Sequence, residues 1–219
     1  NSVAIGRLAL YAQDPASAAD MNNVAVGYLS GTAATTATAS TLIGSQAGSA
    51  LTSGINNTAV GAFSLNADTL GKFSVAVGNG ALERQNFTSS TNVYNTAVGY
   101  DAGSRITTGV QNTFIGGLSG DANTTGNNNV SVGKSSFSAN TTGSSGTAVG
   151  AFALLANTTG ANNTAIGNSS LAANTTASNN TAVGLGALGA NTTGTRNTAV
   201  GANALDASTT ANYNSAFGT

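Results

Sequence analysis

Residues 163–179 read Asn-Thr-Ala-Ile-Gly-Asn-Ser-Ser-Leu-Ala-Ala-Asn-Thr-Thr-Ala-Ser-Asn, and residues 180–184 begin the same motif again with Asn-Thr-Ala-Val-Gly. The motif recurs along the whole chain. Its glycines are Gly6, Gly27, Gly44, Gly61, Gly78, Gly99, Gly116, Gly133, Gly150, Gly167, Gly184, Gly201 and Gly218. Ten of the twelve spacings are 17-residue intervals, and the spacings 6–27 and 78–99 are 21-residue intervals. Such regularity indicates an ordered repeat array instead of a disordered low-complexity chain.

Numbering each repeat from its glycine as position 0 separates the residues into columns. Position −1 is large and apolar in every copy, position −3 is Val or Thr in all but one, and position −2 is Ala in ten of thirteen. Position +3 is Ala or Ser, and position +4 is Leu or Phe in eight of twelve copies and Gly in the other four. Position −4 is mostly Asn, and position +8 is Thr in all ten 17-residue repeats.

These columns predict strands and turns. β-Branched residues at −3 and −1 point to one face of a strand because strand side chains alternate. Positions +2 to +4 can form a second short strand, and the Asn-Thr-Thr-Gly segments are typical of turns. A 17-residue unit is too short for a helical repeat with its own core, so we expect an all-β parallel β-solenoid of about 13 coils. We treat residues 1–219 as a single repeat domain.

Stacked coils bring each residue beside its own copy in the next coil. We expect the −1 residues to form an aliphatic core ladder, comprising Val60, Val98, Val149, Ile166, Val183 and Val200. The small residues at −2 would then lie on the opposite face and pack against other copies of the chain, comprising Ala59, Ala148, Ala165, Ala182 and Ala199. Asn and Thr columns are expected to bond along the stack.

The composition excludes several functions. Charged residues make up only 6% of the chain, 6 of them basic and 7 acidic, and there is no His and no Cys. Disulfides, thiolate or imidazole metal sites and His-assisted nucleophiles are therefore impossible. With a net charge of −1 the chain has no excess of basic residues for binding nucleic acid, and no apolar run is long enough to span a membrane. We expect no enzyme activity, no catalytic residue, no cofactor and no metal.

The phrase Asn1-Ser2-Val3-Ala4-Ile5-Gly6, with variants at residues 163–167 and 197–201, resembles the head repeat of YadA-like trimeric autotransporter adhesins. The resemblance covers the whole chain and implies a left-handed parallel β-roll, a homotrimer and an adhesive role outside the cell. Similar Asn-Thr-Ala-Val-Gly arrays occur in phage tail fibres. The 17-residue period exceeds that of the adhesin heads and favours the fibre-like relatives.

We expect these residues to be a segment of a longer surface or virion fibre, because solenoids need capping segments and neither end of the sequence reads as one. The expected partners are its own copies and an unknown receptor, glycan or matrix protein. The two 21-residue coils are the candidate binding loops, since insertions in solenoids often form the binding face. Their candidate residues are Asp14, Asp20, Glu83, Arg84, Phe87 and Tyr94.

A monomeric ice- or glycan-binding solenoid is the alternative. Ice binding would call for outward Thr in alternation on a flat strand, whereas Thr-Thr at +8 and +9 is adjacent. Asn-x-Thr triplets at Asn86, Asn123, Asn157 and Asn191 are possible glycosylation acceptors.

Overall fold

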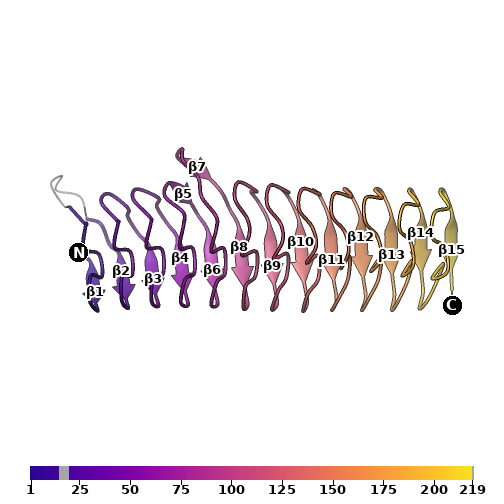
Figure 1. The fold of residues 1–219 in the computed structure, drawn as a ribbon, viewed down its shortest axis with the longest axis horizontal. Helices are drawn as coiled ribbons and strands as arrows, with labels where there is room; N and C mark the ends of the chain where they lie inside the picture. The colour runs from indigo at the N-terminus through magenta and orange to yellow at the C-terminus, as the bar shows by residue number, and fades with distance from the viewer. Residues whose placement is uncertain (15–19, 219) are drawn as a thin grey trace. The chain divides into compact units, whose positions relative to one another are not determined.

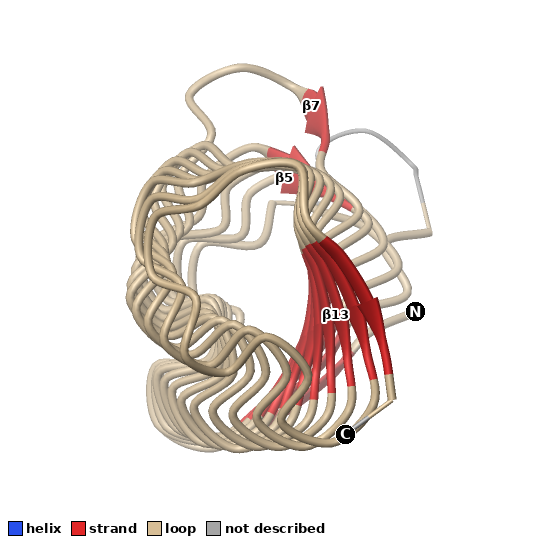
Figure 2. Cartoon of the chain, turned by 90° about the vertical axis from the view of Figure 1, so that its right-hand side faces the viewer, coloured by secondary structure: helices blue, strands red, loops and turns tan. Residues whose placement is uncertain are grey.

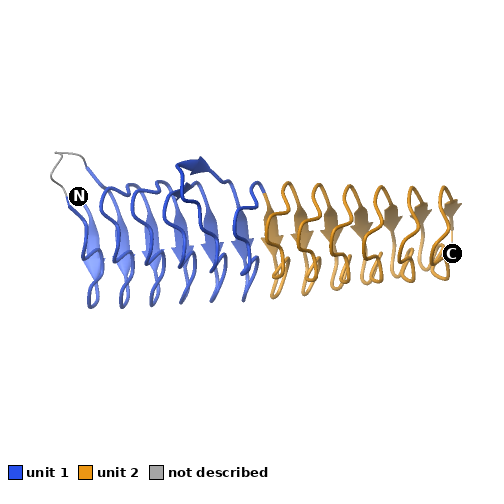
Figure 3. Ribbon diagram, turned by 45° about the horizontal axis from the view of Figure 1, so that its top comes forward, with its two compact units in different colours: residues 1–111 blue, residues 112–219 orange. Residues whose placement is uncertain are grey.

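The structure is a computed structural model that describes residues 1–14 and 20–218. The chain divides into two compact units, residues 1–111 and 112–219 (Figure 3). Within the described residues each unit is a stack of coils with parallel strands and no helix, which confirms the predicted β-solenoid. In each unit a coil is one turn of the winding chain, with its strand on one side (Figure 2).

Three-residue strands at the −3 to −1 positions form the sheet of each unit (Figure 1). In the first unit they are β1 (Val3–Ile5), β2 (Val24–Val26), β3 (Thr41–Ile43), β4 (Thr58–Val60), β6 (Val75–Val77) and β8 (Thr96–Val98), with a separate pair β5 (Gly71–Lys72) and β7 (Thr91–Asn92). In the second they are β9 (Thr113–Ile115), β10 (Val130–Val132), β11 (Thr147–Val149), β12 (Thr164–Ile166), β13 (Thr181–Val183), β14 (Thr198–Val200) and β15 (Ser215–Phe217).

Neighbouring strands pair in register, so that a residue lies beside its equivalent in the next coil. Ala148 is opposite Ala165, which is opposite Ala182, which is opposite Ala199. The glycine after each strand belongs to this contact. A Cβ on Gly150 would come within 2.6 Å of the backbone of Gly167, and its φ of +132° disfavours any side chain. The motif glycine is therefore required for coils to approach at strand spacing.

Positions +2 to +4 do not form the predicted second strand. They are a turn in which the residue at +4 has left-handed φ, for example +50° at Leu154 and +49° at Leu171. Left-handed backbone costs a residue with a side chain about 1–2 kcal/mol. Burying a Leu side chain contributes about 1.5–3 kcal/mol, and these two side chains are fully buried. The turn persists because it drives the +4 side chain into the coil.

The predicted facing of the strand residues is wrong. The −2 residues Ala59, Ala148, Ala165, Ala182 and Ala199 are fully buried inside the coil and are not available as a chain–chain face. The −1 residues Val60, Val98, Val149, Ile166, Val183 and Val200 point outward and are half-buried or exposed, so they are not the core ladder. The coil is too narrow for a large residue on both walls. The Leu or Phe at +4 fills the interior and leaves space only for Ala at −2.

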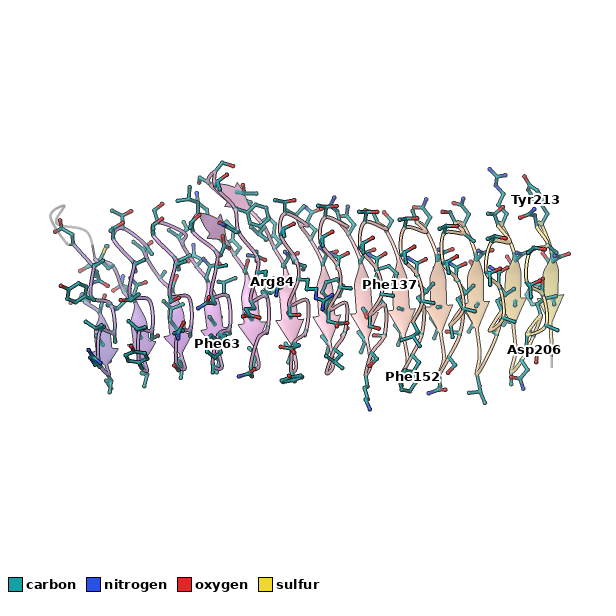
Figure 4. The ribbon with its side chains drawn as sticks, in the orientation of Figure 1. Phe63, Arg84, Phe137, Phe152, Asp206 and Tyr213 are labelled. Atoms are coloured by element: carbon teal, nitrogen blue, oxygen red, sulfur yellow. The ribbon has the colours of Figure 1, made fainter. Side chains whose placement is uncertain are left out.

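Exceptions in the −2 column demonstrate this limit of space. Leu42 replaces Ala and is fully buried, and a Cβ on either Gly31 or Gly48 would lie 2.7 Å from its side chain. Phe114 is likewise buried, and a Cβ on Gly120 would lie 2.6 Å from its ring. These glycines stand at +4, where other coils have Leu or Phe, as at Phe137 in the coil interior (Figure 4). A large residue at −2 is thus matched by Gly at +4.

Buried amides form a ladder along the interior of the second unit. Five asparagines at +7 are fully buried, and the Nδ2 of each one after Asn123 donates to Oδ1 of the asparagine one coil earlier: Asn140 to Asn123 at 2.6 Å, Asn157 to Asn140 at 3.0 Å, Asn174 to Asn157 at 2.8 Å and Asn191 to Asn174 at 3.1 Å. Asn123, Asn157 and Asn191, considered above as glycosylation acceptors, are therefore enclosed in the fold, whereas Asn86 is exposed.

A second ladder uses the asparagines at −4. Asn163 Nδ2 donates to the carbonyl of Ala177 at 2.7 Å, while its Oδ1 accepts the Asn180 N–H at 3.0 Å. The +8 threonines add a further set, as when Thr141 Oγ1 donates to the Thr158 carbonyl at 3.1 Å. The expectation that Asn and Thr columns bond from coil to coil is confirmed, and the −4 and +7 amides lie inside the coil.

The limited interior space predicts that Ala165→Leu changes the free energy of unfolding in opposite directions in two backgrounds. Ala165→Leu alone is expected to lower the free energy of unfolding by about 1–3 kcal/mol, because Leu154 and Leu171 already fill the interior. In a Leu154→Gly/Leu171→Gly background, which reproduces the surroundings of Leu42, the same substitution should raise it by filling the cavity. Urea unfolding of the four proteins measures both effects. A loss of stability in both backgrounds would contradict this account.

Candidate functional site

The first long coil places both of its predicted loop acids on the surface. Asp14 and Asp20 lie outside the core, and Asp20 Oδ1 accepts from Asn1 Nδ2 at 3.1 Å and lies 4.0 Å from the Asn1 amino group. Residues 15–19, which include Pro15, lie outside the described residues. Met21, in the same coil, is only 4% exposed and belongs to the core.

The second long coil carries a projecting segment. β7 pairs in parallel with β5 and stands out from the neighbouring coils (Figures 1 and 2). Phe87 and Val93 bracket the segment and are both buried, whereas Thr88, Ser89 and Ser90 are exposed. The insertion is thus held at both ends by apolar side chains.

The predicted binding residues of this coil do not form one cluster around a ligand. Glu83 is half-buried, Arg84 is exposed and Phe87 points inward as an anchor. Tyr94 is 51% exposed and stacks on Phe73, with ring centroids 5.2 Å apart and the ring planes within 8° of parallel. Tyr94 is therefore the predicted residue that offers a large contact surface, and Phe73 is a partner that the sequence reasoning missed.

A buried carboxylate lies at the base of the inserted segment. Asp68 Oδ1 accepts the N–H groups of Gly71 and Phe87, both at 3.1 Å, and Oδ2 accepts from Gln85 Nε2 at 2.6 Å. Gln85 also donates to Ser74 Oγ at 2.9 Å and accepts from Asn95 Nδ2 at 2.9 Å. Asp68 and Gln85 occupy the +7 positions that hold asparagines in the second unit, and Asp68 ties the start of the insertion to the preceding coil.

Burial raises the pKa of the Asp68 carboxyl, although hydrogen bonds from Gln85, Phe87, Gly71 and Thr69 act to lower it. Sequence reasoning missed this group because a single Asp in a polar repeat looks like a surface residue. The available signal was its column, since the neighbouring coils have Leu51 and Gln85 at +7 and no other residue of that column is charged.

The outward face of the strands is an uncharged surface that continues from coil to coil within each unit. Its −3 and −1 columns contain only Val, Ile, Thr, Ser and Phe, without a single charged residue. Val98 is 36% exposed, Ile115 39% and Ile166 41%. Beside this face, Phe63 and Phe152 also lie exposed at position +2 (Figure 4). A sheet face turned to water normally carries polar and charged residues, so this surface is suited to contact with another surface.

The comparisons with known proteins assign no relative. No protein-family model matches the chain, and neither a curated protein nor a solved structure is significantly similar to it. Among the described residues, no group of three or more His, Cys, Asp or Glu is placed to hold a metal ion. Within that same part of the chain, no helix is long and apolar enough to cross a membrane.

The raised pKa of Asp68 predicts an unusual pH dependence. A folded-state pKa above the ordinary value of 3.8 means that the folded chain binds more protons than the unfolded chain. The free energy of unfolding should therefore be highest below pH 3.8 and decrease as the pH rises through the folded-state pKa of Asp68. Urea unfolding across this range measures the slope, and Asp68→Asn should abolish it. An equal slope in Asp68→Asn would assign the effect to other groups.

Proposed function

We propose that the chain is a structural, non-enzymatic segment of an extracellular fibre, in which identical chains associate through the outward face of their strands. The observation that carries the proposal is the absence of charge from the −3 and −1 columns in both units. A solvated sheet face or edge usually carries Lys or Glu, which prevent association. Here apolar and Thr side chains repeat at every coil.

The repeat also supports a shaft-like role. A stack of in-register coils joined by backbone hydrogen bonds and amide ladders can be extended by copying one coil, because each coil contacts only its neighbouring coils. The resemblance to trimeric adhesin heads and phage tail fibres leads us to propose a homotrimer on a cell surface or a virion. An adhesin segment and a tail-fibre shaft would share this architecture, and in either one we expect receptor contacts at loops that depart from the repeat, because binding residues are concentrated on loops.

A second candidate is a monomeric ice-binding solenoid. The strand face favours it because Thr and Val alternate outward, with Thr164, Thr181 and Thr198 in one row and Ile166, Val183 and Val200 in the next. Rows repeat at strand spacing of about 4.8 Å, and alternate residues are about 6.6 Å apart along a strand. This alternating array is more regular than the Thr-Thr turn considered from the sequence.

Light scattering separates the two candidates. Self-association predicts a mass that is a multiple of 21.1 kDa, three copies for a trimer, and no thermal hysteresis. A folded monomer of 21.1 kDa would overturn the fibre proposal, and thermal hysteresis of that monomer would favour ice binding.

Charges on the strand face should abolish association without unfolding the chain. Ile166→Lys/Val200→Lys places ammonium groups on the outward face two coils apart, where they stay hydrated in the monomer but cannot be buried between chains. The expected result is a folded monomer. Thr159→Lys/Thr193→Lys is the matched control, because these exposed +9 residues have the same separation along the stack but lie outside the strands. Equal oligomer size in both variants would refute this interface.

A further inference from the structure

We propose that the second long coil carries a binding site for neutral carbohydrate, formed by the Phe73–Tyr94 ring pair and the hydroxyl-rich segment 88–92. The inference deepens the proposed function, since it assigns a receptor chemistry to a loop of the fibre. Three independent features of the described residues support it: the composition of two columns, the bracing of the loop and its lack of charge.

The columns at −6 and −5 change character beside the insertion. In the coils of the second unit they hold small or polar residues in most copies, such as Ser144 and Ser145 or Ser178 and Asn179. Beside the insertion the −6 column holds the half-buried Ile55, Lys72 and Val110 and the buried Val93. The −5 column holds the half-buried Phe73 and the exposed Tyr94 between Asn56 and Gln111. Apolar and aromatic side chains therefore gather on the outside of the coils where the loop projects. A sugar ring presents an apolar C–H face that packs against such a surface, while Tyr keeps a polar hydroxyl for hydrogen bonding.

Hydrogen bonds hold both ends of the loop in the absence of a ligand. The Phe87 N–H donates to Asp68, and the Phe87 carbonyl accepts from Thr69 Oγ1 at 2.8 Å and from the Leu70 N–H at 3.1 Å. On the other side, the Val93 N–H donates to the Lys72 carbonyl at 3.1 Å. A loop held at both ends loses little conformational entropy on binding, which favours a ligand that makes few strong contacts.

The exposed side chains of the loop match sugar hydroxyls. Thr88, Ser89, Ser90 and Asn92 are exposed and carry hydroxyl or amide groups, which both donate and accept hydrogen bonds. None of residues 88–92 is charged. Lys72, opposite Asn92 across the β5–β7 pair, is the cation that an acidic sugar would contact, so acidic glycans are the competing ligands to test.

The test applies the labelled full chain to an array of neutral, sialylated and sulphated oligosaccharides. We expect retention on neutral oligosaccharides and at least a tenfold weaker retention for Tyr94→Asn, corresponding to about 1.4 kcal/mol. Asn suits this position because Asn56, Asn162 and Asn179 occupy the same column with left-handed φ. Deleting residues 88–91 restores the 17-residue interval and should weaken retention in the same way.

Tyr213→Asn is the matched control and should leave retention unchanged. Tyr213 occupies the same column with a φ of +60°, compared with +54° for Tyr94, and is 68% exposed. It packs on the Arg196 guanidinium, 5.3 Å from the ring centroid, and belongs to a coil without an insertion.

Each failure is distinguishable. Retention of only sialylated or sulphated glycans, no retention at all, or equal loss in Tyr94→Asn and Tyr213→Asn would overturn the inference. Light scattering on the same samples reports self-association separately. An associated chain that retains no neutral glycan contradicts the carbohydrate site alone, whereas a monomer contradicts the proposed fibre.

Discussion

Outside the two insertions, a residue in a coil packs beside its own copy one repeat away, and this in-register contact determines the composition of the chain. A charged residue repeated in a column would face the same charge at strand spacing, where like charges are destabilising. A repeated amide is stabilising instead, because its N–H group donates to the oxygen of the amide in the neighbouring coil. The ladder from Asn123 to Asn191 uses this complementarity at every step without a charge. Scarcity of charge is thus a consequence of copying one coil.

The narrow interior is the second consequence of a short repeat. One large side chain at +4 and one small residue at −2 fill the coil, and the motif glycine allows the next coil to approach. The turn at +2 to +4 accepts left-handed backbone to bring Leu154 or Leu171 inward. Because the strain of that turn and the burial of a Leu are of similar size, the turn is stable only where the side chain is enclosed.

Periodicity alone predicts the class of fold, the strand at −3 to −1 and the coil-to-coil ladders, since all three follow from the 17-residue interval, but it also suggested a strand at +2 to +4 where the chain forms a turn. It does not determine which strand face is inside, because alternation is equally consistent with either choice. The large residues at −1 suggested a core, but Leu42 between Gly31 and Gly48 carried the decisive signal of steric compensation. The Phe73–Tyr94 stack and the Asp68 bonds could not be predicted, because the insertion interrupts the repeat that aligns other columns.

The two kinds of surface follow from the same constraint. A feature that every coil shares can only produce an extended, uniform face, and the Val, Ile and Thr columns are such a face, suited to a partner with the same repeat. Recognition of a small ligand needs a local departure from uniformity, because one site must differ from its neighbours. Residues 87–94 make that departure and remain anchored to the ladder through Asp68 and β5. In the proposed function, assembly depends on the repeated coil, and recognition depends on the inserted segment that the repeated coil holds in place.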